Sequence, residues 1–127
     1  MTIISISLND KMLNELDKIQ DEMAFSGRSE VIRAGIRMLI AETKEREKLS
    51  GNVKGVLLLI HDHAVENFVT KVKHNFLDII HTQLHNKLKE GKCLEMFILD
   101  GDSNRVIKLI ELFQKNEKIE YSNLVVT

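Results

Sequence analysis

The feature that most constrains this chain is a strand that has nothing to pair with. The first segment, TIISISLND, alternates so that Ile4, Ile6 and Leu8 share one face, which predicts a half-buried strand. Its other face carries Ile3, Ser5 and Ser7. No second strand pattern follows within the first half, so both edges of this strand stay open. The sequence therefore predicts a homodimer in which the same strand of two chains pairs.

Two amphipathic helices follow this strand. Asn9 is predicted to cap the first one, Gly27 interrupts the pattern, and Ser29 is predicted to cap the second. The charged stretch ETKEREKLSGN then indicates a linker near residues 49–52. We therefore expect one domain over residues 1–48 and a second over residues 53–127.

Composition limits the function classes. The 18 Lys and Arg residues face 19 Asp and Glu residues, for a formal net charge of −1, which excludes attachment to nucleic acid by bulk electrostatics alone. The longest apolar run, residues 56–60, is too short to span a bilayer, so we expect no membrane association. A single cysteine cannot form an internal disulfide, which favours a reducing, cytoplasmic location.

The second half alternates between strand and helix patterns. Strands are expected over residues 53–60, 79–88, 93–101 and 119–126, and helices over residues 63–76 and 103–116. The order βαββαβ is the ferredoxin-like plan, which also occurs in small-ligand-sensing (ACT-like) regulatory domains. The expected fold class is α+β.

The first half resembles the ribbon-helix-helix DNA-binding fold, through ISISLNDKMLNELDKI and GRSEVIRAGIRMLI. The resemblance implies an intertwined dimer whose paired strands enter the major groove of a double-stranded operator. The outward strand residues Ile3, Ser5 and Ser7 would face base edges, and the backbone near Arg28 and Ser29 would face a phosphate.

The whole chain resembles the nickel-responsive repressor family, whose signature joins three histidines and a cysteine followed by Leu-Glu. Here His74 is followed after ten residues by His85, then by position 87, and after five more by Cys93-Leu94-Glu95. The resemblance implies a metal-responsive repressor, no enzyme activity, and a dimer of dimers in which His74 is donated across a tetramer interface. The implied ion is Ni²⁺, with Cu²⁺, Co²⁺ and Zn²⁺ as alternatives.

Position 87 departs from the family pattern, because it holds Lys87 in place of a histidine. An ammonium has no lone pair and repels a divalent cation. Three outcomes stay open: His81 serves as a substitute ligand, water fills the place, or Lys87 pairs with the Cys93 thiolate and the site binds no metal.

Other readings remain beside this one. A ribbon-helix-helix regulator could instead sense another metal, a small organic ligand or oxidation of Cys93, since a nearby lysine would lower the thiol pKa. An enzyme with Cys93 as nucleophile and an antitoxin are less consistent with the pattern. His61 and His63 are expected to be surface or hydrogen-bonded residues, and Glu30 a helix first-turn acid.

Overall fold

The computed structural model describes residues 1–127. The chain divides into two compact units, Met1–Glu47 and Lys48–Thr127, and each is described by itself. No helix in either unit combines the length and hydropathy that crossing a bilayer demands.

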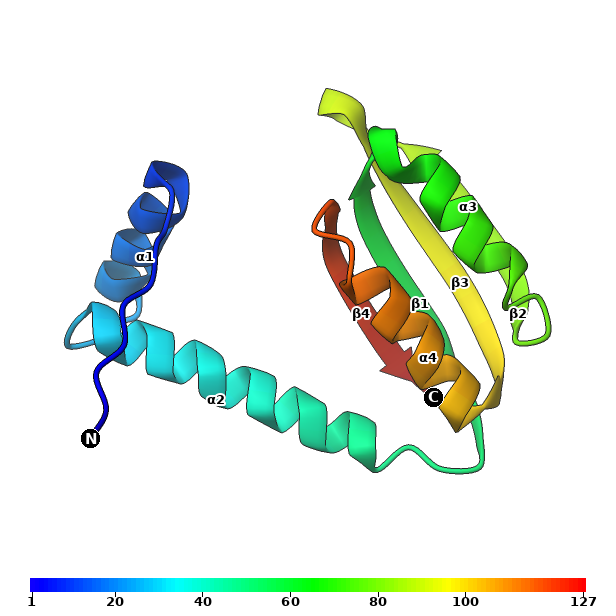
Figure 1. Cartoon of the computed structure of the whole chain (residues 1–127), viewed down its shortest axis with the longest axis horizontal. Helices are drawn as coiled ribbons and strands as arrows, with labels where there is room; N and C mark the ends of the chain where they lie inside the picture. Colours follow the sequence, from blue (N-terminus) through cyan, green and yellow to red (C-terminus); the bar gives the residue numbers. More distant parts are fainter. The chain divides into compact units, whose positions relative to one another are not determined.

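The N-terminal unit contains an extended segment and two helices, α1 (Asp10–Glu22) and α2 (Arg28–Glu47), drawn in blue to cyan (Figure 1). Asn9 caps α1 as predicted, since its side chain accepts a hydrogen bond from the Met12 backbone N–H at 2.8 Å. Ser29 does not cap α2, so that prediction is wrong. The Gly27 carbonyl already accepts from the Val31 N–H at 3.3 Å, which places Ser29 inside the first turn.

The segment before α1 is not a strand in the single chain, although its sequence predicts one. A strand needs a second strand to form hydrogen bonds with, and residues 1–8 have no such partner strand here. The apolar face that should be half-buried is solvent-exposed, with Ile4 at 77% and Ile6 at 56%. Val31 is the only buried residue of this unit. A unit with so small a core needs a partner to fold stably.

The C-terminal unit has the predicted βαββαβ order. Its elements are β1 (Asn52–Asp62), the short 3-10 helix η1 (His63–Val65), α3 (Glu66–His74), β2 (Ile80–Lys87), a second 3-10 turn η2 (Lys89–Gly91), β3 (Lys92–Asp102), α4 (Ser103–Gln114) and β4 (Ile119–Val126). The strands form one antiparallel sheet in the order β2-β3-β1-β4. Asp102 caps α4, since its side chain accepts a hydrogen bond from the Asn104 N–H at 3.0 Å.

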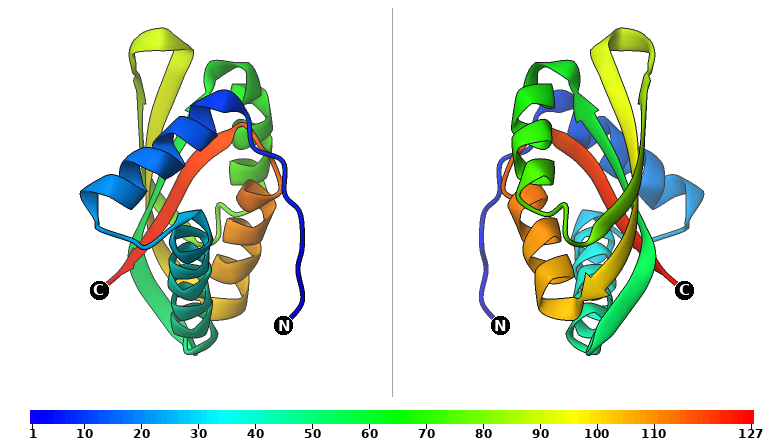
Figure 2. Two further views of the ribbon diagram at one scale, coloured as in Figure 1. Left: turned by 90° about the vertical axis from the view of Figure 1, so that its left-hand side faces the viewer. Right: turned by 90° about the vertical axis from the view of Figure 1, so that its right-hand side faces the viewer.

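Both helices of this unit cover the same face of the sheet, as the two side views show (Figure 2). The core lies between them and alternate residues of the central strands, where Phe97 of β3 stacks on Phe113 of α4 with ring centroids 5.9 Å apart. The opposite face of the sheet is not covered by any helix of the unit. It carries the partly or fully exposed apolar side chains Val56, Leu58, Ile60, Leu84, Leu94, Met96, Ile98, Tyr121 and Val125.

The register of β3 with its neighbours sets the position of the only cysteine. Cys93 lies directly opposite His61 of β1 and Lys87 of β2. Two residues along, Glu95 lies opposite His85. Residues opposed in this way point to the same side of a sheet, so all five point toward the helix-covered face.

Candidate metal centre and DNA-binding segment

The start of β3 places Cys93 in contact with His63, which was not among the metal ligands expected from the sequence. The thiol is fully buried, and its Sγ lies 3.7 Å from Nδ1 of His63. His63 is brought there by the turn at the end of β1, where Asp62 caps η1 by accepting from the Ala64 N–H at 2.8 Å. The return of the chain after β1 therefore covers the start of β3.

Glu66 connects His63 to His85 of β2. One carboxylate oxygen, Oε2, lies 3.1 Å from His63 Nδ1, and the other, Oε1, lies 3.5 Å from His85 Nε2. His63, Glu66, His85 and Cys93 thus form a continuous series of contacts, which we call the Cys93 cluster. It joins η1, α3, β2 and β3 at one end of the sheet.

The surroundings of Cys93 favour the protonated thiol. Burial raises the pKa of the Cys93 thiol, and the carboxylates of Glu66 and Glu95 raise it further. Lys87 lowers the pKa, as the sequence suggested, but the other effects outweigh it. The expected low-pKa, redox-active thiol is therefore wrong for the folded protein without metal.

A buried polar network lies next to the cluster. Glu95 accepts a 2.8 Å hydrogen bond from Gln83 Nε2, and its other oxygen lies 2.8 Å from His61 Nε2. The second His61 nitrogen lies 2.9 Å from the Asp62 carbonyl, so both ring nitrogens have partners. Lys73 of α3 donates to Gln83 and completes the network. His61 is the hydrogen-bonded residue that the sequence suggested, because both of its ring nitrogens lie within hydrogen-bond distance of oxygen atoms.

His74 and His81 lie away from the cluster. His74 ends α3, about 12 Å along the helix axis from Glu66. His81 lies in β2, about 13 Å along the strand from His85. Within one chain, neither can share an ion with Cys93. No three His, Cys, Asp or Glu side chains of the single chain converge closely enough to hold a metal ion as they stand.

The predicted DNA-binding residues are accessible. Ile3, Ser5 and Ser7 are all exposed. The Arg28 guanidinium makes two hydrogen bonds with the carboxylate of Asp17, at 2.9 and 3.0 Å, and so connects the start of α2 to α1. Glu30 accepts from Arg33 and Arg37 of its own helix at 3.0 and 2.8 Å. This pairing agrees with the interpretation of Glu30 as a helix acid.

Comparison with known proteins identifies the family. The family described as NikR C terminal nickel binding domain matches residues 54–127, and the family described as ribbon-helix-helix protein, copG family, matches residues 2–43. The chain belongs to the NikR family. It is a regulator of transcription with a ribbon-helix-helix N-terminal domain, and not an enzyme.

The curated relatives span nearly the same length. A protein of Methanocaldococcus jannaschii named "Putative nickel-responsive regulator" is 37% identical over 114 residues, covering 87% of this chain and 81% of the relative. A protein of the same name from Methanococcoides burtonii is 31% identical over 124 residues, covering 95% and 89%. Among solved structures, the uncharacterized protein TM1266 of Thermotoga maritima aligns with a TM-score of 0.48 and 14% identity, covering 61% of this chain and 96% of that one, a similarity too low to bear on function.

The metal ligands expected from the sequence come together only in part. His85 and Cys93 lie on the same face of adjacent strands, and an imidazole with a thiolate suits a borderline divalent ion. Lys87 cannot act as a ligand as an ammonium, and it stands directly opposite Cys93. His74 can join only from another subunit. Of the metal ligands expected from the sequence, His85 and Cys93 thus lie at this end of a single chain.

His63 is half exposed and paired with Glu66, as expected of a surface or hydrogen-bonded residue, but its contact with Cys93 and the place of Glu66 in the cluster were not predicted. The local signal was present, because Asp62 is a good cap and His63 and Glu66 are three residues apart, the spacing at which neighbours in a helical turn meet. Their proximity to Cys93 depends on the pairing of β1 with β3, which no local pattern specifies.

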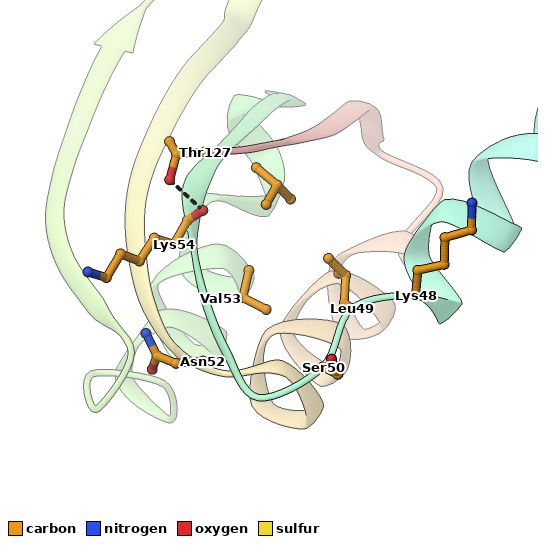
Figure 3. A pocket seen from close by; sticks show the side chains of 8 residues that line it. Lys48, Leu49, Ser50, Asn52, Val53, Lys54 and Thr127 are labelled. Atoms are coloured by element: carbon orange, nitrogen blue, oxygen red, sulfur yellow. Dashed lines mark hydrogen bonds between the residues drawn. The ribbon is translucent and has the colours of Figure 1, made fainter.

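A shallow hollow of about 290 Å³ lies at the opposite end of β1 from the Cys93 cluster (Figure 3). Among its lining residues, Thr127 donates from its hydroxyl to the Lys54 carbonyl at 3.1 Å. Lys54 and His61 are about 23 Å apart along β1. The hollow is therefore separate from the candidate metal centre.

Proposed function

We propose that this NikR protein is a metal-responsive transcriptional repressor that inserts a two-stranded ribbon into the major groove of its operator in the cytoplasm. The proposed ligand is Ni²⁺, in keeping with the nickel-binding domain that residues 54–127 match. Support comes from the two family matches and from the apolar side chains that both units leave exposed in the single chain.

The exposed N-terminal unit is the observation that carries the proposal. The apolar faces of its segments should form a core, yet the single chain buries Val31 alone. Exposed instead are Ile4, Ile6, Leu8, Met12, Ile19, Ile36, Leu39 and Ile40. A second copy would cover these side chains and pair residues 2–8 with their equivalents, which closes the open edge of each strand.

Such a ribbon presents its other face to DNA. Ile3, Ser5 and Ser7 would meet base edges, where serine hydroxyls can donate or accept and isoleucine can contact a thymine methyl group. Because Asp17 engages the side chain of Arg28, the phosphate contact would come chiefly from the Ser29 hydroxyl and the N-terminal backbone N–H groups of α2.

The C-terminal unit would join two such dimers into a tetramer. The sheet face that no helix of the unit covers is apolar, and a second copy of the same face is its natural cover. A shared interface also allows His74 of one subunit to approach the metal centre of another. In that arrangement the separation of the two DNA-binding dimers depends on whether the sensor is occupied.

The ligands available at this centre determine how an ion would be bound there. His85 and Cys93 would provide an imidazole nitrogen and a sulfur, and a bound ion would favour the thiolate form of Cys93. The repressor function then follows from a population shift, in which the occupied protein favours the arrangement that matches the operator half-sites.

DNA binding in the presence of metal tests the proposal. We expect the full-length protein to bind operator DNA more tightly with Ni(II) than without metal, and we would compare Co(II), Cu(II) and Zn(II). Ser5→Ala should weaken DNA binding about five- to tenfold, roughly the value of one lost base contact. Ser50→Ala, in the linker, is the matched control and should change nothing. Equal DNA binding with and without all four metals would rule out metal response.

A further inference from the structure

We propose that the Cys93 cluster is a divalent metal site completed within one chain, in which His63 and Glu66 supply the donors that Lys87 and the distant His74 do not. The site would hold one ion through two imidazoles, one thiolate and one carboxylate. The inference deepens the proposed function, because the role of the site as a sensor rests on that function.

The distances between the donors support a tetrahedral ion. With metal–sulfur bonds of about 2.3 Å and metal–nitrogen or metal–oxygen bonds of about 2.05 Å, tetrahedral geometry separates sulfur from nitrogen by about 3.6 Å and nitrogen from oxygen by about 3.3 Å. Cys93 Sγ lies 3.7 Å from His63 Nδ1, close to the tetrahedral sulfur–nitrogen value; Glu66 lies 3.1 Å from His63 through Oε2 and 3.5 Å from His85 through Oε1, on either side of the tetrahedral nitrogen–oxygen value. Adjacent donors in a square plane would be about 2.9–3.1 Å apart with the same bond lengths, a range that includes only the contact between His63 and Glu66.

The donors form a series of contacts and not yet a closed shell. Three of them have room to move, since the side chains of His63, Glu66 and His85 are 50%, 35% and 29% exposed. Small rotations of these side chains can bring them around one point beside the buried Cys93 sulfur. Cys93 itself is fixed near the start of β3, where that strand pairs with both β1 and β2.

The net charge of the Cys93 cluster also suits a divalent cation better than three imidazoles and a thiolate beside Lys87 would. Three imidazoles and a thiolate carry one net negative charge. In this chain the Cys93 thiolate and the Glu66 carboxylate together carry two, and the ammonium of Lys87 reduces the sum to one. The Glu66 carboxylate therefore restores the charge that the lysine removes.

The chemistry of the set indicates which ions it would favour. A tetrahedral arrangement of nitrogen, oxygen and sulfur suits Zn(II) and Co(II) more than the square-planar preference of Ni(II). The ion would bind without a contribution from another subunit, so occupancy should not require the tetramer.

Cobalt is the probe that tests this inference, because tetrahedral Co(II) absorbs strongly in the visible region and a bound thiolate adds a charge-transfer band. Metal-free full-length protein would be titrated with Co(II) alone. We expect both absorption features in the wild type. His63→Ala and Glu66→Gln should each weaken Co(II) binding by about 10- to 100-fold and reduce the visible bands. His74→Ala discriminates between an intrachain site and a shared one, since an intrachain site does not need this histidine. Lys89→Gln, in the exposed turn between β2 and β3, is the matched control and should leave affinity and spectrum unchanged, with circular dichroism confirming that every variant is folded.

The opposite pattern would overturn the inference. If His74→Ala abolishes Co(II) binding and His63→Ala does not, the ion is shared between subunits; if the wild type binds no Co(II), there is no such site. Measuring DNA binding of the same proteins separates the two proposals. Metal-dependent DNA binding that His63→Ala leaves intact defeats this inference alone. Co(II) binding that needs His63 but does not affect DNA binding defeats the proposed sensing role alone.

Discussion

Replacing Lys87 by glutamine should strengthen metal binding at Cys93. Lys87 faces Cys93 directly across β2 and β3. Opposed residues of an antiparallel pair have Cβ atoms about 5 Å apart. The lysine side chain therefore keeps its charge within reach of any ion on the cysteine sulfur, and Lys87→Gln removes that charge while retaining a polar side chain.

The size of the gain follows from Coulomb's law and from exposure. At about 8 Å and an effective dielectric of 20, one positive charge opposes a divalent ion by roughly 4 kcal/mol. Lys87 is exposed, so water and salt screen most of that energy, and a net effect near 1 kcal/mol is reasonable. We expect the dissociation constant for Co(II) or Ni(II) to fall about five- to tenfold at low ionic strength.

Competition titrations against a chelator measure this constant for the wild type, for Lys87→Gln and for Lys89→Gln, a control in the exposed hairpin turn. The gain should nearly vanish in 1 M salt, where the screening length is only about 3 Å. Unchanged affinity at low salt would refute the electrostatic argument, and a gain that persists in 1 M salt would show that Lys87 acts by another route. Weaker binding in Lys87→Gln would show that the lysine contributes a donor.

Three further predictions concern stability. Gly101→Ala should cost about 1–3 kcal/mol, seen as a lower midpoint of thermal denaturation, because its Cβ would lie 2.3 Å from Cγ2 of Ile79. The raised pKa of the Cys93 thiol favours folding below the ordinary thiol pKa of about 8.5 and loses that effect as pH rises through the folded pKa; urea denaturation with a chelator present should therefore show a smaller alkaline loss for Cys93→Ser. The Arg105 guanidinium lowers the pKa of Asp78, so their pair stabilises the fold above about pH 4 and is lost as pH falls through the folded pKa; Asp78→Asn should show less acid destabilisation.

The sequence was sufficient where a signal is local. Asn9 and Asp102 each stand just before an amphipathic pattern. The side chain of each accepts a hydrogen bond from a backbone N–H in the first turn of its helix. The alternation of strand and helix patterns likewise specified the order of the C-terminal elements. Ser29 failed because two residues, Gly27 and Ser29, could each begin the helix, and backbone hydrogen bonding starts at the glycine.

The sequence was insufficient where position depends on tertiary pairing or on a second chain. Residues 2–8 have strand periodicity, but periodicity supplies no hydrogen-bonding partner, and the single chain leaves them extended. Cys93 could be assigned as a metal-binding candidate from its spacing to His85. Its contact with His63 depends on the β1–β3 register, which aligns Cys93 with His61 and so sets the following turn above the sulfur.

Helix α3 connects the two ways in which this protein could form its metal centre. Glu66 at its start belongs to the Cys93 cluster, and His74 at its end is free to reach another subunit. Lys73, one residue before His74, is hydrogen-bonded to Gln83 and thereby to the buried Glu95 network beside the cluster. If ion binding at Glu66 shifted α3, the position of His74 at the other end of the helix would therefore change as well. An intrachain site would in this way still influence assembly, even though no ligand crosses between subunits.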